Sequence, residues 1–213
     1  MVKKKKDRTI KVYVEGGGDS NSLRTRCRQG FSAFLERAGF KGRMPRVIAC
    51  GGRQAAYDTF KTALKAQESA LLLIDSEEKV SAHSPWAHLR KEFQPPPNAG
   101  DAHCHLMVVC MESWFLADKE ALAEFFGQGF NAGALPKRED VEAISKDDVY
   151  RCLQQASANC KTKTPYGKGE HSFLLLSKVD PEKIASSSPW AARFLKELEH
   201  FMKRESSTSE KPE

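Results

Sequence analysis

A short apolar run that ends in a carboxylate and three glycines places the strongest constraint on what this chain can fold into. Residues 10–14 are Ile-Lys-Val-Tyr-Val, and Glu15 and then Gly16 to Gly18 follow at once. The run predicts a β-strand, and the glycines predict a loop that a second backbone or a phosphate can approach closely. Because open α/β sheets bind their ligands at the carboxyl ends of strands, we expect Glu15 at such an edge.

The same order of strand, turn and helix recurs along the chain. Residues 46–50 form a second apolar run before Gly51-Gly52, and residues 69–74 form a third, which is hydrophobic enough for a strand buried on both faces. Helical periodicity follows the first two runs, and a fourth strand is expected at 103–109. This alternation predicts an α/β fold with a mainly parallel central sheet flanked by helices.

The pattern changes after Gly127, where helices are expected without further strands. We therefore predict one α/β domain over residues 9–204, in which residues 127–204 form a helical extension. The lysine-rich residues 1–8 are expected to be a flexible basic terminus, and residues 205–213 a disordered tail. The helices expected before and within the extension cover 115–126, 147–158, 170–178 and 189–203.

Composition limits the classes of protein to which the chain can belong. Its 213 residues carry 34 Lys and Arg against 28 Asp and Glu, a net charge of +6, which permits contact with nucleic acid without establishing it. No apolar run approaches the length of a membrane span and no signal-peptide core follows the first lysines, so we expect a cytoplasmic protein without membrane contact. Six cysteines without a CxxC pair indicate neither disulfides nor structural zinc.

Acidic residues follow three of the expected strands. Parallel strands end at one edge of a sheet, so acids that are distant in sequence can meet there. Carboxylates that converge repel one another unless a cation neutralises them, and oxygen ligands favour Mg²⁺ or Mn²⁺ over zinc. The alternative is that each acid is only a helix cap or a solvated turn residue. The acids concerned are Glu15 with Asp19, Asp75 with Glu77, and Glu112 with Asp118.

Basic and histidine residues near these strand ends have two interpretations each. Arg24, on the helix after the glycines, and Arg53, at the start of the next helix, are candidate phosphate contacts, although both are also ordinary for exposed helix positions. His103 and His105 alternate along the expected fourth strand. We expect packed or hydrogen-bonded strand histidines there, because no third metal ligand has suitable spacing.

These residues carry a resemblance to a known family. Val-Tyr-Val-Glu-Gly-Gly-Gly-Asp at 12–19 and Leu-Leu-Leu-Ile-Asp-Ser-Glu at 71–77 resemble the Toprim domain of topoisomerases, primases and overcoming-lysogenization-defect nucleases. Cys-Met-Glu-Ser-Trp-Phe-Leu-Ala-Asp at 110–118 and the later Lys-Gly loop resemble a small stand-alone bacterial Toprim-like family, often encoded beside a predicted ATPase in defence loci. The resemblance covers roughly residues 10–200 and implies a Toprim-like sheet with extra C-terminal helices.

The resemblance also implies roles for individual residues. Glu15 matches the first-strand glutamate, a metal ligand or general acid/base, and Asp75 with Glu77 matches the metal-binding pair, here Asp-x-Glu in place of the usual Asp-x-Asp. Two further acids match an acid after the glycines and an acid of the nuclease branch, both proposed as metal ligands, and one lysine matches a basic residue that would stabilise negative charge in the transition state. These are Asp19, Glu112 and Lys168.

The leading functional hypothesis is a nuclease that uses Mg²⁺ or Mn²⁺ to hydrolyse DNA or RNA, in a bacterial defence module with an ATPase partner. Self-association into a homo-oligomer is left open. The first alternative is a non-catalytic Toprim-like subunit that recruits nucleic acid or the ATPase. The second is a phosphotransfer-type module in which Asp75 would accept phosphate with the help of Mg²⁺.

Overall fold

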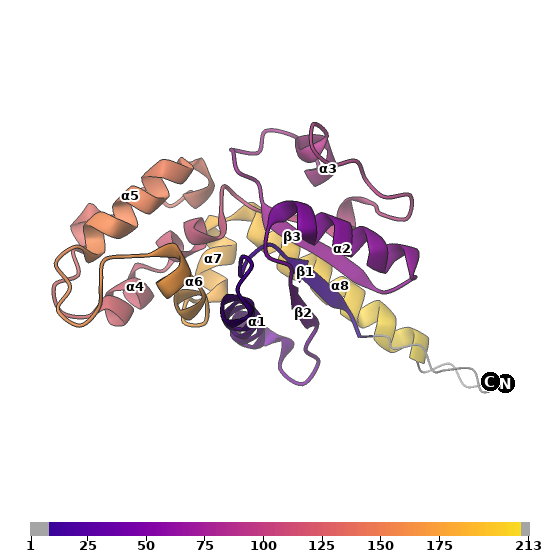
Figure 1. The fold of residues 1–213 in the computed structure, drawn as a ribbon, viewed down its shortest axis with the longest axis horizontal. Coiled ribbons are helices and arrows are strands. Elements are labelled where there is room, and N and C mark those ends of the chain that lie inside the picture. The colour runs from indigo at the N-terminus through magenta and orange to yellow at the C-terminus, as the bar shows by residue number, and fades with distance from the viewer. Residues whose placement is uncertain (1–8, 210–213) are drawn as a thin grey trace.

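A computed structural model describes residues 9–209 of the chain, and the predicted flexible terminus at 1–8 lies outside them, as do residues 210–213. Its centre is a four-stranded sheet in which every pair of neighbouring strands is parallel (Figure 1). The predicted α/β fold with a parallel sheet is confirmed. The strands, in the order β2-β1-β3-β4, are β1 (Lys11–Val14), β2 (Arg46–Ala49), β3 (Ala70–Asp75) and β4 (Cys104–Met107).

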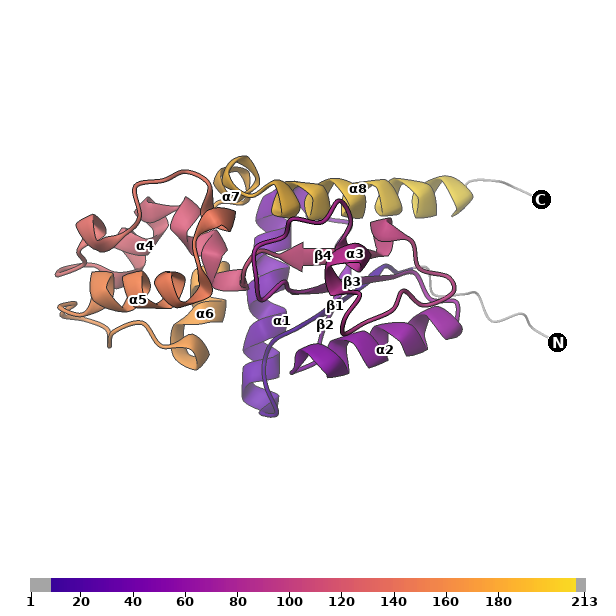
Figure 2. The same ribbon diagram turned by 90° about the horizontal axis from the view of Figure 1, so that it is seen from above.

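Helices cover both faces of this sheet. Figure 2 shows α2 (Arg53–Lys65) and α8 (Pro189–Ser209) on opposite sides of the strands. All six residues of β3 are buried, as a central strand covered on both faces requires. Helix α1 (Asn21–Leu35) begins after the glycine loop, where Ser20 accepts a hydrogen bond from the backbone N–H of Leu23.

Apart from α8, the helices after Asp118 form a separate layer beyond the edge at which the strands end (Figure 2). This layer packs against the sheet domain closely through α1 and α6 (Lys168–Leu176). A Cβ on Gly30 of α1 would lie 2.6 Å from the carbonyl oxygen of Phe173 in α6, so glycine is needed for this approach. The other helices of the layer are α4 (Lys119–Phe126), α5 (Lys146–Ser157) and α7 (Pro181–Ser187).

The structure corrects the helix expected at 115–126. A 3₁₀ helix at Met111–Ala117 and α4 replace it, and Asp118 separates the two. The reason is local: the Asp118 carboxylate accepts a hydrogen bond from the backbone N–H of Ala121 and so begins a new helix. Smaller elements that the sequence did not predict are a π-helical turn at Glu36–Phe40 and 3₁₀ turns at Ala132–Ala134 and Val141–Ala143.

One further helix was missed, and the ends of two predicted elements differ from the sequence predictions. Helix α7 was not predicted, and α8 continues to Ser209, so the tail expected from residue 205 begins within a helix. His103 belongs to a 3₁₀ turn at Asp101–His103 rather than to a strand, and the short helix α3 (Pro85–Leu89) lies between β3 and β4. Within the described residues, no helix combines the length and apolar composition that a membrane crossing requires.

His105 confirms the expectation of a packed strand histidine. Its ring is fully buried, its Nδ1 lies 3.1 Å from a guanidinium nitrogen of Arg193, and its Nε2 lies 3.1 Å from the carbonyl oxygen of Ala102. Because arginine only donates hydrogen bonds, Nδ1 is the acceptor and Nε2–H donates to Ala102. Burial lowers the pKa of His105 to about 3. The histidine is therefore a neutral core residue.

Candidate metal centre

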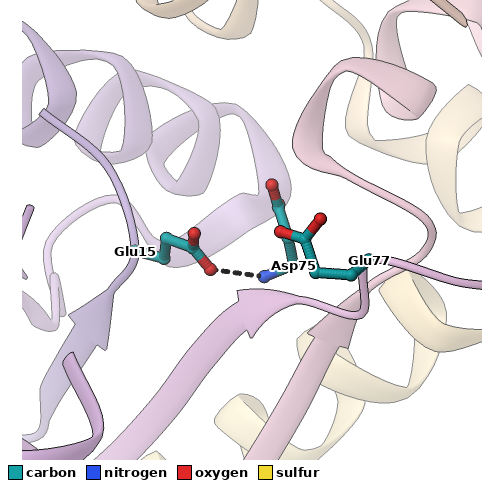
Figure 3. A group of neighbouring side chains, drawn as sticks. All are labelled: Glu15, Asp75 and Glu77. Atoms are coloured by element: carbon teal, nitrogen blue, oxygen red, sulfur yellow. Dashed lines mark hydrogen bonds between the residues drawn. The ribbon is translucent and has the colours of Figure 1, made fainter. Parts of the chain in front are cut away.

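Three acids from two adjacent strands meet at the edge where the sheet ends. Glu15 follows β1, Asp75 is the last residue of β3, and Glu77 lies two residues further on. Since β1 and β3 are parallel neighbours with Val14 opposite Leu73, their ends bring these acids side by side. One carboxylate oxygen of each residue lies within 4.8 Å of the others (Figure 3), so the group could hold a metal ion.

Backbone groups fix the positions of the three carboxylates. The backbone N–H of Asp75 donates to Glu15 Oε2 at 3.1 Å, and the backbone N–H of Met111 donates to Asp75 Oδ1 at 2.9 Å. Glu77 has a φ of 66°, a left-handed conformation that is uncommon for residues other than glycine. Its backbone N–H donates to the carbonyl oxygen of Val109 at 2.9 Å, which holds this turn in place.

Burial and mutual repulsion make this group unfavourable for three negative charges. Asp75 is 4% exposed, and no described residue donates a hydrogen bond to its Oδ2. Burial, with the nearby charges of Glu15 and Glu112, holds the pKa of Asp75 well above its usual range. Burial, with the charge of Glu77, also raises the pKa of Glu15. A divalent cation with oxygen ligands would relieve this repulsion, so the donor set fits such an ion.

Two lysines bring positive charge to the site. Lys146, the first residue of α5, forms an ion pair with Glu77. Burial alone would lower the pKa of Lys146, but the hydrogen bond to Glu77 and the charge of Asp75 outweigh burial and raise it. Lys168, the first residue of α6, lines the cavity beside Glu15 and Asp75, and the catalytic role that the resemblance implies for it stays a prediction. Lys146 was missed, because no motif surrounds it in the sequence.

Glu112 has a different environment from the one predicted for a metal ligand. Its side chain is fully buried, and both carboxylate oxygens accept hydrogen bonds from hydroxyl groups. Tyr150 donates to Oε2 at 3.0 Å, while Tyr166 and Ser172 donate to Oε1 at 3.2 and 3.1 Å. These hydroxyls come from the helical layer. Glu112 lies in the cavity wall but outside the group of three acids, and it ties the helical layer to the strand ends.

Two other predicted residues also lie outside the group of three acids. The side chain of Asp19 is fully exposed and lies 3.9 Å from Arg24, so the structure does not place it as a metal ligand. Arg24 donates from Nε to the carbonyl oxygen of Gly18 at 2.9 Å. This bond makes Arg24 a support for the glycine loop.

Arg53 forms an ion pair with a residue outside the site. Its guanidinium forms a 2.9 Å ion pair with Glu92 and lies 5.5 Å from the ring centre of Phe93. Its charge still acts on Glu15, whose pKa it lowers against the larger effect of burial. Arg24 and Arg53 both have protein partners in this structure. The phosphate contacts predicted for these two residues stay predictions.

A cavity of about 310 Å³ opens beside the acids and is bounded on one side by glycines. Gly16 and Gly51 exchange backbone hydrogen bonds of 2.8 and 2.9 Å, which join the two glycine turns. Gly51 has a φ of 85°, and a Cβ there would lie 2.7 Å from the carbonyl oxygen of Gly18. Glycine is therefore required at this point, as the sequence indicated for a loop under close approach.

Fold and site together define an α/β protein with a carboxylate group and a cavity at the carboxyl edge of a parallel sheet. The chain belongs to the family described as a domain of unknown function (DUF4276), whose model matches residues 14–199. That match includes the group of three acids and the helical layer. Neither the curated proteins nor the solved structures contain a match to this chain.

Proposed function

We propose that this protein is a divalent-metal-dependent nuclease of the Toprim type, which hydrolyses phosphodiester bonds in DNA or RNA. The observation that carries the proposal is the group of Glu15, Asp75 and Glu77, whose carboxylate oxygens lie within 4.8 Å of one another. The Toprim resemblance implies metal binding by these three residues, and also by Asp19 and Glu112, which lie outside the group. The basic net charge of +6 is compatible with a nucleic acid substrate.

Glu15, Asp75 and Glu77 would hold the cation, for which Mg²⁺ or Mn²⁺ suits carboxylate ligands best. When bound, such an ion neutralises charge on a phosphate and makes bound water more acidic. Asp75 offers an oxygen without a hydrogen-bond donor among the described residues, and the only hydrogen bond to Glu15 within that part of the chain goes to Oε2. Both residues therefore keep lone pairs for a ligand.

In the hydrolysis reaction, Glu15 would take part in proton transfer and Lys168 would stabilise negative charge. The oxygen of a water molecule forms a bond to phosphorus, and the bond from phosphorus to the leaving sugar oxygen breaks. Glu15 would accept the proton that the water loses through a carboxylate oxygen that does not bind the cation. The Lys168 ammonium lines the same cavity and would stabilise negative charge on the phosphoryl oxygens. The leaving oxygen takes a proton from solvent.

The test is cleavage of plasmid DNA, single-stranded DNA and transfer RNA by wild type, Glu15→Gln and Asp75→Asn with Mg²⁺ or Mn²⁺. We expect both variants to lose at least about 100-fold in rate, since each removes a ligand or proton acceptor. Asp19→Asn is the matched control, because its exposed carboxylate lies outside the group of three acids. Cleavage by both site variants at the rate of the control would refute the proposal.

One contact favours a second candidate function. The Lys146–Glu77 ion pair already neutralises part of the acidic charge without a metal. This supports a non-catalytic Toprim-like subunit that recruits nucleic acid or the ATPase partner implied by the resemblance. A complex with nucleic acid that is independent of divalent ions, without turnover of any substrate in the same assay, would favour this candidate.

A further inference from the structure

The cavity beside the acids has two chemically different walls. One wall carries Glu15, Asp75, Glu112 and Lys168, whose charges suit a phosphate together with a cation. The other wall is apolar and consists of Leu23, Met111 and Phe173. This lining suits a ligand that has an apolar part as well as a charged one.

The apolar wall stands against the glycine loop. The Cζ atom of Phe173 lies 3.2 Å from the position that a Cβ on Gly16 would take, so the ring lies directly beside the loop. In contrast, no atom lies within 4 Å of the position of a Cβ on Gly18 or Gly52, both of which line the cavity. A ligand can therefore reach the backbone at Gly18 and Gly52 without meeting a side chain.

The size and depth of the site restrict what can enter it. A volume of about 310 Å³ is at the lower end of the roughly 300–1,000 Å³ that small-molecule sites occupy. Asp75 is 4% exposed, so a phosphate must enter the cavity to reach this carboxylate. A phosphate within a stacked duplex cannot do so unless its nucleotide leaves the stack, which costs unstacking free energy.

We infer that the cavity holds one whole nucleotide, with its phosphate at the acids and Lys168 and its base against Phe173, Leu23 and Met111. The inference rests on the proposed function and narrows its substrate to flexible single strands, strand ends or free nucleotides. Interior positions of an intact duplex are excluded. Aromatic side chains bind bases of any sequence in this way, because every base has a flat π-face.

Binding measurements test the inference without turnover. Adenosine monophosphate and ribose phosphate, which lacks the base, are titrated in the presence of Mg²⁺ into wild type and Phe173→Leu. We expect adenosine monophosphate to bind wild type at least about 5-fold more tightly than ribose phosphate, and Phe173→Leu to lose this difference, since base stacking on an aromatic ring supplies it. Ribose phosphate should bind both proteins equally.

Leu174→Ala is the matched control for the Phe173 variant. Leu174 is the neighbouring residue on α6, is 47% exposed and does not line the cavity. We expect this variant to bind both ligands as wild type does. Equal affinity of wild type for the two ligands, no binding of adenosine monophosphate, or equal losses in the two variants would overturn the inference.

Cleavage separates this inference from the proposed function. We expect a single-stranded oligonucleotide to be cut at least about 10-fold faster than the same sequence in a covalently closed duplex, because the duplex must first unstack. Binding of adenosine monophosphate without cleavage of any substrate would refute the nuclease and leave the nucleotide site standing. Equal cleavage of single strand and closed duplex would refute the nucleotide site and leave the nuclease standing.

Discussion

Replacing Asp75 with asparagine should stabilise the metal-free protein, although Asp75 is buried at the centre of the site. The substitution removes one of three neighbouring negative charges and keeps the shape of the side chain. Asparagine retains the oxygen that accepts the hydrogen bond from the backbone N–H of Met111. Its amide group can also donate to the carboxylates of Glu15 or Glu77, which aspartate cannot do when ionised.

The magnitude follows from the separation of the charges. At the 4.8 Å that bounds the oxygen atoms of the group, two unit charges repel by about 3.5 kcal/mol at an effective dielectric constant near 20. Asp75 has two such neighbours, while Lys146 and Lys168 offset much of the repulsion. We expect a net gain of about 1–3 kcal/mol in the free energy of unfolding, or about 2–12 °C in Tm for a chain of this length.

Asp118 offers a matched control with the opposite expected sign. It is also 4% exposed, but its carboxylate accepts hydrogen bonds from Lys183 and from the backbone N–H of Asp180, both at 2.9 Å. Burial alone would raise the pKa of Asp118, yet the bond to Lys183 and the backbone donors outweigh burial and lower it. Asp118→Asn should therefore destabilise the protein by about 1–3 kcal/mol.

Thermal and urea denaturation in a chelator at neutral pH would compare the two variants with wild type. Adding Mg²⁺ should raise the Tm of wild type and leave that of Asp75→Asn unchanged, because the variant has lost a ligand. If Asp75→Asn lowers the free energy of unfolding as much as Asp118→Asn does, charge repulsion in the group of three acids is refuted.

Two further predictions concern the surroundings of the site. The pKa of buried His105 is about 3, whereas a histidine in the unfolded chain has a pKa of about 6.5. Between these two pH values the unfolded state binds more protons, so His105 lowers the free energy of unfolding by about 1.4 kcal/mol for each pH unit of acidification. Urea denaturation of His105→Gln at several pH values should lack this contribution to the slope. Identical slopes for variant and wild type would contradict the neutral state of His105. Gly51→Ala should lower the free energy of unfolding by about 1–3 kcal/mol in the same assay, because Gly51 has a φ of 85° and lies beside the carbonyl of Gly18. Gly52→Ala should lower it much less, since a Cβ there meets open space. Equal losses of stability in the two variants would contradict the role of the turn.

The sequence predicted the strands, the glycine turn and the meeting of the three acids, because these depend on short apolar runs and the residues that follow them. Apolar runs followed by glycine or acid located all four strands, and parallel pairing then brought Glu15, Asp75 and Glu77 together as expected. The glycines signalled the turn at Gly51, since only glycine tolerates its backbone conformation beside another carbonyl. Each strand was predicted from residues close to one another in the chain, and parallel pairing then explains how Glu15 and Asp75 meet although they are 60 residues apart.

The remaining parts of the site depend on contacts between distant segments. The three hydroxyls that bind Glu112 lie 38, 54 and 60 residues from it, and the ion pair between Lys146 and Glu77 spans 69 residues. No local pattern distinguishes these partners from other tyrosines, serines or lysines. Asp19 was expected among the ligands because it follows the glycines, but its exposed side chain lies outside the group of three acids.

Isothermal titration of Mg²⁺ and Mn²⁺ into wild type, Asp75→Asn and Asp19→Asn measures the central property of the site most directly. Asp75 lies within the group of three acids and Asp19 lies outside it, so the two variants remove the same chemical group from different places. We expect wild type and Asp19→Asn to bind the cation alike and Asp75→Asn to lose at least about tenfold in affinity. Cation binding that survives Asp75→Asn unchanged, or the absence of binding to wild type, would contradict a metal site at these strand ends.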